Sequence, residues 1–305
     1  MLDKSKPIAV LMGGPGSEKD VSIASGRAVA GALRGEGCEV LEVVVTDTTP
    51  KIPDGVQLCF NVIHGTFGED GALQAYLENQ QMPYTGTGIE SSRIAFDKLL
   101  SKEKFVAAGV PTPKSESVPA GETPKMAPPL VVKPPCEGSS VGIHVVQTAE
   151  ELSPALEDAA KYAEEILIEQ FVAGRELTVG VLDGEVFPVV EIIPPADGWY
   201  DMETKYPWLS GKEGGSTYVC PAEFDDATTE KIQAAALAAY KSLEIEVYAR
   251  VDVLVDHSGH PYVLEVNTIP GMTESSLLPK AGKEAGYEFG ALCLKIAELS
   301  LKARS

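Results

Sequence analysis

The alternation of apolar and polar residues is clearest in the stretch from 248 to 279. Residues 250–255 read Arg-Val-Asp-Val-Leu-Val and residues 262–267 read Tyr-Val-Leu-Glu-Val-Asn, with a polar turn containing Gly259 between them. Two β-rich runs around such a turn predict a β-hairpin. The loop that follows, Ile269 to Thr273, breaks the second strand and is a natural place to hold a ligand.

Successive side chains of a strand point to opposite faces, so the register of the hairpin decides which side chains meet. If Val255 pairs with Tyr262, two carboxylates lie opposite each other and a guanidinium lies opposite an amide. These four groups belong to Asp252, Glu265, Arg250 and Asn267. In the same register the alternate positions point into a core, namely Val251, Val253, Leu264 and Val266.

Two carboxylates placed directly across a sheet repel each other, so something must compensate them. Carboxylate and amide oxygens suit Mg²⁺, and Arg250 beside them suits an anion that also touches the metal. Asp252, Glu265 and Asn267 are therefore candidate metal ligands. The pattern alone fits a solvated acidic face equally well, and both interpretations stay open at this point.

The N-terminal segment has the alternation of strand and helix that is typical of a parallel α/β unit. Residues 7–12 predict a strand, residues 20–34 a helix, and residues 39–46 and 58–63 two more strands. The Gly-rich turn Gly13 to Gly16 lets a ligand approach the start of the helix. The turn lacks the third glycine of the dinucleotide motif GxGxxG, so a nicotinamide cofactor is only weakly indicated.

Two polar side chains lie where predicted parallel strands end, which is where open α/β sheets bind ligands. They are Glu18, after the first strand, and His64, after the third. The local sequence favours a simpler role for Glu18, in which its carboxylate complements the dipole of the following helix. Glu69 and Asp70 are interpreted in the same way, as acids at the start of a helix formed by 72–78.

A flexible loop joins two predicted strands in the middle of the chain. The strand 130–133 ends in Lys133, the loop 134–142 is rich in Gly and Ser, and 143–146 returns. Backbone N–H groups of such a loop can wrap phosphates, although an ordinary hairpin loop is the alternative. The loop is not a Walker motif, because no Gly-Lys-Ser/Thr leads into a helix.

Other segments complete the expected elements. A helical segment carries Lys98 and Lys102, and 108–129 is interpreted as a Pro-rich connection outside the core. The segment 194–220 has no clear periodicity and many glycines, which is typical of a lid or binding loop. Strands are expected at 166–172, 177–181 and 187–193, and helices at 150–165, at 227–241 and at the end of the chain.

The chain has 305 residues, enough for two or three domains, and a formal charge of −20. This charge argues against a surface for nucleic acid or an anionic membrane, and an anionic ligand would need a local cluster of Lys and Arg. Five scattered cysteines without a CxxC pair predict reduced thiols in a cytoplasm rather than disulfides or zinc. We expect neither a secretory signal nor a membrane span.

Taken together, several motifs make the chain similar to the D-alanine–D-alanine ligases, members of the ATP-grasp superfamily. In chain order the motifs are GGPGSEKDVSIASG, HGTFGEDG, PYTGTG with FDKLLSK, VVKPPCEGSSVG, ILIEQFVAGRELTVG, YDMETKY, RVDVLVD and LEVNTIPGMTESSL. They run nearly from end to end, and their order at family-like spacing is far more specific than any one of them alone.

The resemblance implies an α/β protein whose ATP-grasp part is α+β, with three domains. Residues 1–92 would form a Rossmann-like substrate domain, 93–172 a central subdomain with the Gly/Ser loop, and 173–305 a C-terminal subdomain with the metal site and the lid 194–220. ATP would lie between the sheets of the last two. The family also suggests a homodimer.

The resemblance further implies roles for particular residues. Two Mg²⁺ ions, or Mn²⁺, would bind Asp252, Glu265 and Asn267. The phosphates of ATP would contact Lys98, Lys133, Gly138, Ser139 and Ser140. Its adenine and ribose would contact Glu169, Gln170, Val172 and Glu176. D-alanine would meet Glu18, His64, Lys205, Ser276 and Leu277. Arg250 and the Gly271 N–H would stabilise oxyanions, while Ser139, Tyr206 and Glu18 would latch the lid.

These roles imply ATP-dependent ligation of two D-alanine molecules through an acyl phosphate, for peptidoglycan precursor synthesis. The alternatives are a D-alanine–D-lactate or another ATP-grasp carboxylate–amine ligase, and a nucleotide-binding protein without catalysis. Arg250 argues against a pure binder, which has no need of a guanidinium between metal ligands and a second substrate. Tyr206 stands where the D-lactate ligases carry His, and a neutral side chain does not repel the ammonium of D-alanine.

Overall fold

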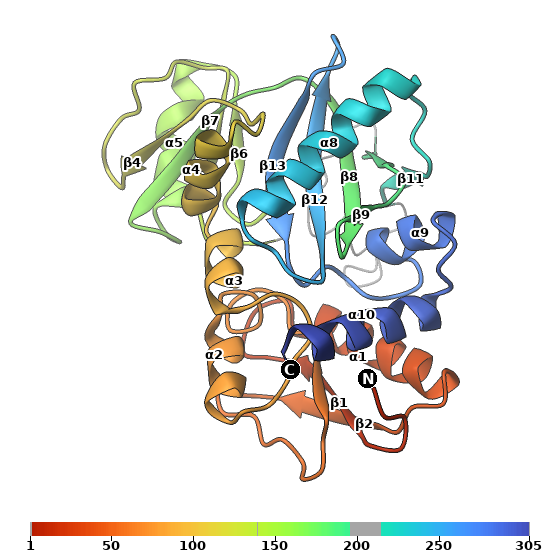
Figure 1. Ribbon diagram of the computed structural model, residues 1–305. Coiled ribbons are helices and arrows are strands. Elements are labelled where there is room, and N and C mark those ends of the chain that lie inside the picture. The colour runs from red at the N-terminus through yellow and green to blue at the C-terminus, as the bar shows by residue number, and fades with distance from the viewer. Residues whose placement is uncertain (1, 139, 196–214, 305) are drawn as a thin grey trace.

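The computed structural model describes residues 2–138, 140–195 and 215–304. These residues form three separate sheets of three, four and six strands. The three-stranded sheet occupies the lower part of the molecule in Figure 1, and the other two stand above it. The predicted fold class, a parallel α/β part followed by an α+β part, is confirmed.

The three-stranded sheet is parallel and has the order β2-β1-β3. Every residue of β1 is buried, because the central strand of a parallel sheet is covered on both faces. The predicted strand–helix–strand unit is thereby confirmed. Its elements are β1 (Ile8–Gly13), α1 (Lys19–Gly35), β2 (Val40–Val45) and β3 (Leu58–Asn61).

Three helices lead from this sheet into the rest of the molecule: α2 (Ala72–Asn79), α3 (Ile89–Phe96) and α4 (Lys98–Ala108). Asp97 separates the last two and caps α4, because its side chain accepts hydrogen bonds from the backbone N–H groups of Leu99 and Leu100. The cap ends one helix and begins the next. The position of this cap therefore sets where α4 and its lysines begin.

The four-stranded sheet is antiparallel, with the order β4-β7-β5-β6. The prediction for 108–129 is wrong, because β4 (Ser115–Pro119) lies inside it and buries Val118. Strand β4 has few apolar residues, and its backbone pairing with β7 accounts for its formation. The other elements are β5 (Leu130–Lys133), β6 (His144–Val146), β7 (Glu165–Gln170) and α5 (Ala149–Ala159), which is shorter than predicted.

The six-stranded sheet has the order β11-β10-β8-β12-β13, with β9 added to β8. Helix α8 (Asp226–Ser242) packs on the hairpin β12–β13 (Figure 1). Of the segment 194–220, residues 196–214 lie outside the described residues. The elements are β8 (Gly174–Leu182), β9 (Glu185–Val186), β10 (Val190–Ile193), β11 (Thr217–Val219), β12 (Tyr248–Asp256) and β13 (Pro261–Asn267). The sequence patterns did not predict β9 or β11.

The chain returns to the first sheet at its end. Helix α9 (Leu277–Glu284), which was not predicted, is followed by α10 (Phe289–Ala303), and α10 packs against α1 (Figure 1). Leu292 and Ile296 of α10 share one hydrophobic cluster with Val10 of β1. The C-terminal helix α10 therefore supplies part of the hydrophobic core that covers the N-terminal sheet.

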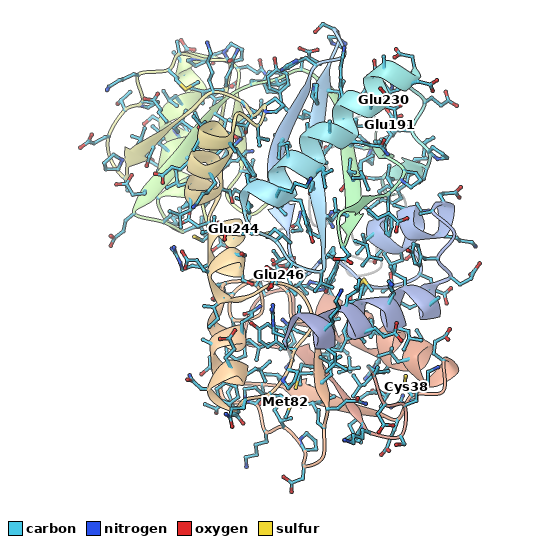
Figure 2. All side chains as sticks on the ribbon, in the orientation of Figure 1. Cys38, Met82, Glu191, Glu230, Glu244 and Glu246 are labelled. Atoms are coloured by element: carbon cyan, nitrogen blue, oxygen red, sulfur yellow. The ribbon has the colours of Figure 1, made fainter. Side chains whose placement is uncertain are left out.

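Many acidic residues are exposed, among them Glu230 and Glu244, which are labelled in Figure 2. All five cysteines are free thiols. No helix among the described residues is long and apolar enough to cross a membrane.

Candidate active site

A cavity of about 290 Å³ lies where the N-terminal sheet, the start of α4 and the hairpin β12–β13 meet. Carboxylates, cations and hydroxyl groups line it together with apolar side chains such as Phe96 and Ile269. Ten of the predicted site residues line it: Glu18, His64, Lys98, Gly138, Arg250, Glu265, Asn267, Gly271, Ser276 and Leu277. Residues far apart in the sequence are thus brought to one place, as the motifs led us to expect.

The hairpin has the predicted pairing at its functional end. Arg250 lies opposite Asn267, and Asp252 lies opposite Glu265. The register then shifts by one residue, so that Val255 pairs with Pro261 and not with Tyr262. A β-bulge of this kind bends the strand and redirects its side chains.

The bulge also corrects one predicted core position. Leu264 is only half-buried, and Val263 takes its place in the core, where it is fully buried. Val251, Val253 and Val266 are buried as predicted.

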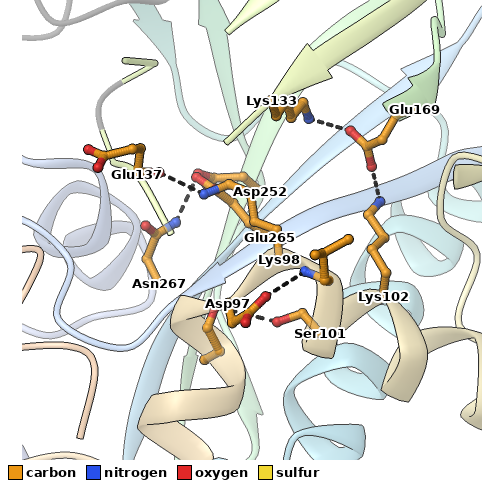
Figure 3. Close-up of polar contacts among 12 residues, drawn as sticks. Asp97, Lys98, Ser101, Lys102, Lys133, Glu137, Glu169, Asp252, Glu265 and Asn267 are labelled. Carbon is orange, nitrogen blue, oxygen red and sulfur yellow. Dashed lines mark hydrogen bonds and ion pairs between the residues drawn. The ribbon is translucent and has the colours of Figure 1, made fainter. Parts of the chain in front are cut away.

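The two facing carboxylates are compensated by protein cations. Arg250 donates two hydrogen bonds to Asp252, from Nε to Oδ1 at 3.0 Å and from an Nη to Oδ2 at 2.9 Å. The ammonium of Lys98 lies 3.1 Å from a carboxylate oxygen of Glu265 (Figure 3). Burial acts to lower the pKa of Lys98, but Glu265 outweighs burial and the pKa is raised. The lysine is therefore firmly charged.

Asp252 and Glu265 fit a hard divalent cation together with Asn267, because all three can present oxygen. Among the described residues, no group of three or more His, Cys, Asp and Glu could hold a metal. In the structure, the amide nitrogen of Asn267 donates a hydrogen bond to Oδ2 of Asp252 over 3.0 Å. The amide would have to present its oxygen to a cation instead.

The N-terminal wall of the cavity holds His64, which is nearly fully buried. Its Nδ1 is 2.9 Å from the carbonyl oxygen of Ile269, and its Nε2 is 3.3 Å from the hydroxyl of Ser25. A carbonyl only accepts, so Nδ1 carries a proton. Burial acts to lower the pKa of His64, but the carboxylates of Glu69 and Glu18 outweigh burial and the pKa is raised.

Glu69 corrects a sequence prediction. Its carboxylate faces His64 at 3.6 Å inside the cavity and does not cap the helix. Burial raises the pKa of Glu69 above its ordinary value. Asp70 is the acid that meets the helix start, where it accepts hydrogen bonds from the N–H groups of Phe67 and Ala72. The motif HGTFGEDG alone does not predict which of its two acids, Glu69 or Asp70, points into the cavity.

A second wall is the loop that leaves β13 and enters α9, which His64 contacts at Ile269. Ser276 is the N-cap residue of α9, and its hydroxyl accepts a hydrogen bond from the N–H of Thr273 at 3.0 Å. A Cβ at Gly271 would lie 3.1 Å from the same hydroxyl, so a side chain would crowd this wall. The loop is also tied to the N-terminal part, since the N–H of Met272 donates to Ser25.

The Gly/Ser loop closes the cavity from the third side. The ammonium of Lys98 donates to the carbonyl of Glu137 over 2.8 Å, and this holds the loop against the start of α4. A Cβ at Gly138 would lie 3.1 Å from a carboxylate oxygen of Glu18, so glycine permits the close approach. Ser139, Lys205 and Tyr206 lie outside the described residues.

The other predicted residues do not line this cavity. Gln170 is exposed, whereas Val172 and Glu176 are half-buried near the junction of β7 and β8. Ser140 lies just beyond Gly138 with a φ of 64°. Asp252 lies behind the cavity wall, where it also accepts a hydrogen bond from Thr178 at 2.6 Å.

Glu169 and Lys133 belong to a buried cluster beside the cavity. The carboxylate of Glu169, of which only 1% is exposed, pairs with Lys133 through one oxygen and with Lys102 through the other (Figure 3). Lys102 was not among the predicted site residues. The available signal was its spacing of four residues from Lys98, which puts both on one face of α4.

This cluster makes the stability of the fold depend on pH. Burial raises the pKa of Glu169, but Lys133 and Lys102 outweigh burial and lower the pKa to about 2 from its usual 4.5. Stability from a depressed carboxyl pKa is present above about pH 4.5 and lost as the pH falls towards 2. We expect the difference in unfolding free energy between wild type and Glu169→Gln to shrink by roughly 1.4 kcal/mol per pH unit in that range.

Urea unfolding at a series of pH values measures this difference. Glu103→Gln is the matched control, because Glu103 is exposed on α4 and should give a difference near zero throughout. A difference for Glu169→Gln that stays constant between pH 5 and pH 3 would contradict the assignment of charge in the cluster.

Comparisons with known proteins identify the family of the chain. Two family models match the chain, described as D-ala D-ala ligase N-terminus over residues 46–87 and D-ala D-ala ligase C-terminus over residues 103–298. A D-alanine–D-alanine ligase of Methylacidiphilum infernorum is 44% identical over 96% of this chain and 95% of its own length. One of Citrifermentans bemidjiense is 42% identical over 97% and 96%.

A solved structure extends the likeness to three dimensions. The D-alanine–D-alanine ligase of Bacillus anthracis complexed with ATP superposes with a TM-score of 0.84 at 32% identity, over 98% of this chain and 99% of that one. The resemblance drawn from the motifs is therefore confirmed. The chain belongs to the D-alanine–D-alanine ligase family of the ATP-grasp superfamily.

Proposed function

We propose that the protein joins two molecules of D-alanine to D-alanyl-D-alanine, converting ATP to ADP and phosphate, and so supplies a peptidoglycan precursor in the cytoplasm. The observation that supports this most is the cavity itself. Glu18, an acid suited to an ammonium, lines the same cavity as Ser276 and Arg250, which suit a carboxylate and an oxyanion. Family membership supports the reaction class.

The first step in the proposal activates a carboxylate, which is a poor electrophile. The γ-phosphoryl group of ATP passes to the carboxylate of the first D-alanine, and ADP leaves an acyl phosphate. Positioning and cationic stabilisation dominate such a transfer. Lys98 and Lys133 would contact phosphates, aided by the backbone of Gly138 and Ser140, while Glu169, Gln170, Val172 and Glu176 would hold the adenosine part. Ser139 completes this set.

The second step forms the peptide bond. Glu18, with His64 near it, would hold the ammonium of the first D-alanine, while Ser276 and Lys205 would hold the carboxylate of the second beside Leu277. The neutral amine of the second D-alanine attacks the acyl phosphate, and Arg250 and the N–H of Gly271 stabilise the oxyanion that forms. Phosphate then leaves. Tyr206 would join Ser139 and Glu18 in keeping water out.

Asp252, Glu265 and Asn267 would hold two Mg²⁺ ions, or Mn²⁺. When bound, the ions would offset the charge of the ATP phosphates. Arg250 and Lys98 contact the carboxylates of Asp252 and Glu265, so both cations would share these carboxylates with the ions. The division into domains at 1–92, 93–172 and 173–305 and a homodimeric assembly are further parts of the proposal.

The test is ADP release in the presence of ATP and Mg²⁺, scanned over D-alanine, L-alanine, D-serine and D-lactate, with products resolved by mass. We expect release that depends on D-alanine and gives the dipeptide. ADP release without any amino acid, or nucleotide binding without turnover, would overturn the ligase assignment. A depsipeptide as the main product near neutral pH would point to the D-lactate type.

A further inference from the structure

Lys102 is a buried cation that the proposed reaction does not use. Only 4% of it is exposed, and its ammonium does not line the cavity. It nevertheless has three acceptors around it: the carboxylate of Glu169, the hydroxyl of Thr112, and the carbonyl oxygen of Val263 at 3.4 Å. A lysine ammonium has three donors, so this set matches its capacity.

The three acceptors belong to three different parts of the fold. Glu169 lies on β7 in the four-stranded sheet, and Val263 lies on β13 at the edge of the six-stranded sheet. Thr112 lies between α4 and β4, and its hydroxyl donates to the same carbonyl of Val263 over 2.7 Å. The N–H of Val263 in turn donates to the carbonyl of Pro111 over 2.8 Å. One ammonium therefore ties two sheets to α4.

Two of the contacts lead to groups that the proposed function assigns to ATP and to its metal ions. On one side, Glu169 shares its carboxylate between Lys102 and Lys133, the proposed phosphate lysine (Figure 3). On the other side, Val263 precedes Glu265 by two residues and lies at the β-bulge of the hairpin. Lys102 thus stands between the phosphate-binding and the metal-binding side chains.

The charges of the cluster explain why a second lysine is useful there. Glu169 with Lys133 alone would be a neutral pair, in which the ammonium of Lys133 is held by one full carboxylate charge. With Lys102 present, the same carboxylate is shared between two lysines, one on each oxygen. Burial lowers the pKa of Lys102, and the carboxylate of Glu169 opposes this shift. Because Glu169 is shared, it holds Lys133 less tightly and leaves it freer to turn to an anion.

We propose that Lys102 is a positioning residue for the binding of ATP. It sets the position of Lys133 through Glu169, and it sets the position of Glu265 through the backbone of Val263. The proposal rests on the proposed function, because it takes the roles of Lys133 and Glu265 from there. It adds that nucleotide affinity depends on a side chain that does not reach the nucleotide.

The experiment compares Lys102→Met with Lys104→Met in initial-rate kinetics. Lys104 lies two residues further along α4 and is exposed, so its replacement controls for the loss of a lysine from the same helix. For Lys102→Met we expect the KM for ATP to rise about tenfold or more, the size typical of losing a group behind a ligand-binding side chain. The KM for D-alanine should stay within about twofold, and Lys102→Arg should restore most of the affinity for ATP, because the positive charge returns.

Two results would overturn the proposal. One is a KM for ATP in Lys102→Met equal to that in Lys104→Met. The other is an equal rise in the KM for ATP and for D-alanine, which indicates a general loss of structure. If Lys102→Met does not fold, Thr112→Val removes the hydroxyl between Lys102 and Val263 while keeping the side-chain shape. It should raise the KM for ATP about two- to threefold, since a single neutral hydrogen bond is lost, and an unchanged KM would again refute the proposal.

Failure of the proposed function can be told apart from failure of this inference. A wild-type protein that forms no D-alanyl-D-alanine refutes the proposed reaction. The affinity for ADP, measured by calorimetry without amino acid, still tests Lys102 in that case. Weaker binding of ADP by Lys102→Met than by Lys104→Met supports the positioning role, and equal binding refutes it.

Discussion

Replacing Glu265 with glutamine should reduce turnover at least about 100-fold, since even outer-shell changes at metal sites cost 10- to 100-fold and Glu265 is a proposed direct ligand. The substitution keeps the shape of the side chain and removes one of the two facing carboxylates. We expect the loss to persist at high Mg²⁺, because a neutral amide does not replace the missing charge. The measurement is the rate of D-alanyl-D-alanine formation over a range of Mg²⁺ concentrations.

The fold should survive this change. The buried ammonium of Lys98 loses its charged partner, but repulsion between Asp252 and Glu265 is relieved and Lys98 keeps its hydrogen bond to Glu137, so the two effects oppose each other. Thermal unfolding of the ion-free variant should therefore stay close to that of wild type. Glu298→Gln, an exposed change on α10, is the control. Activity near that of wild type at saturating Mg²⁺ would remove Glu265 from the metal site.

Replacing Arg250 with methionine should lower kcat about 100- to 1000-fold, the usual cost of losing a group that stabilises an oxyanion. The guanidinium is only 14% exposed and makes two hydrogen bonds to Asp252. Its removal leaves that buried carboxylate with fewer donors, so the ion-free variant should also unfold at a lower temperature. Lysine should restore little, because it cannot reproduce the two parallel hydrogen bonds.

Arg93→Met is the matched control for Arg250→Met. Arg93 also makes two hydrogen bonds to a carboxylate, that of Glu90, but both side chains are at least half exposed. An exposed ion pair contributes little to stability, so this variant should keep both activity and stability. A kcat for Arg250→Met within a few-fold of that for Arg93→Met would show that the guanidinium does not act on the reacting atoms.

The hairpin shows how far alternation can predict a site. The facing pairs Arg250–Asn267 and Asp252–Glu265 follow from a period of two and a single turn, and the structure has both. The bulge beyond them could not be predicted, because no glycine marks Leu264 and the shift arises from packing and from the bond between Val263 and Pro111. The sequence therefore predicted which carboxylates meet but not the full register of the strand.

Long-range partners account for the other differences. Glu69 is a helix-start acid by its local sequence, and it turns inward because His64 lies beside it in the fold. Lys102 looks like any helical lysine, and its role depends on Glu169 and Val263, which belong to other elements. Strand β4 forms because β7 offers it an edge. Local periodicity contains none of this information.

Helix α10 has a consequence for how the chain matures on the ribosome. The first sheet is translated early, but part of its apolar cover, Leu292 and Ile296, is translated near the end. Arg304 then contacts the loop between α2 and α3 by donating to the carbonyl of Gly86 over 2.8 Å. The apolar surface of the nascent N-terminal part therefore stays exposed until α10 has been synthesised. A stalled or shortened translation product should bind chaperones through this surface.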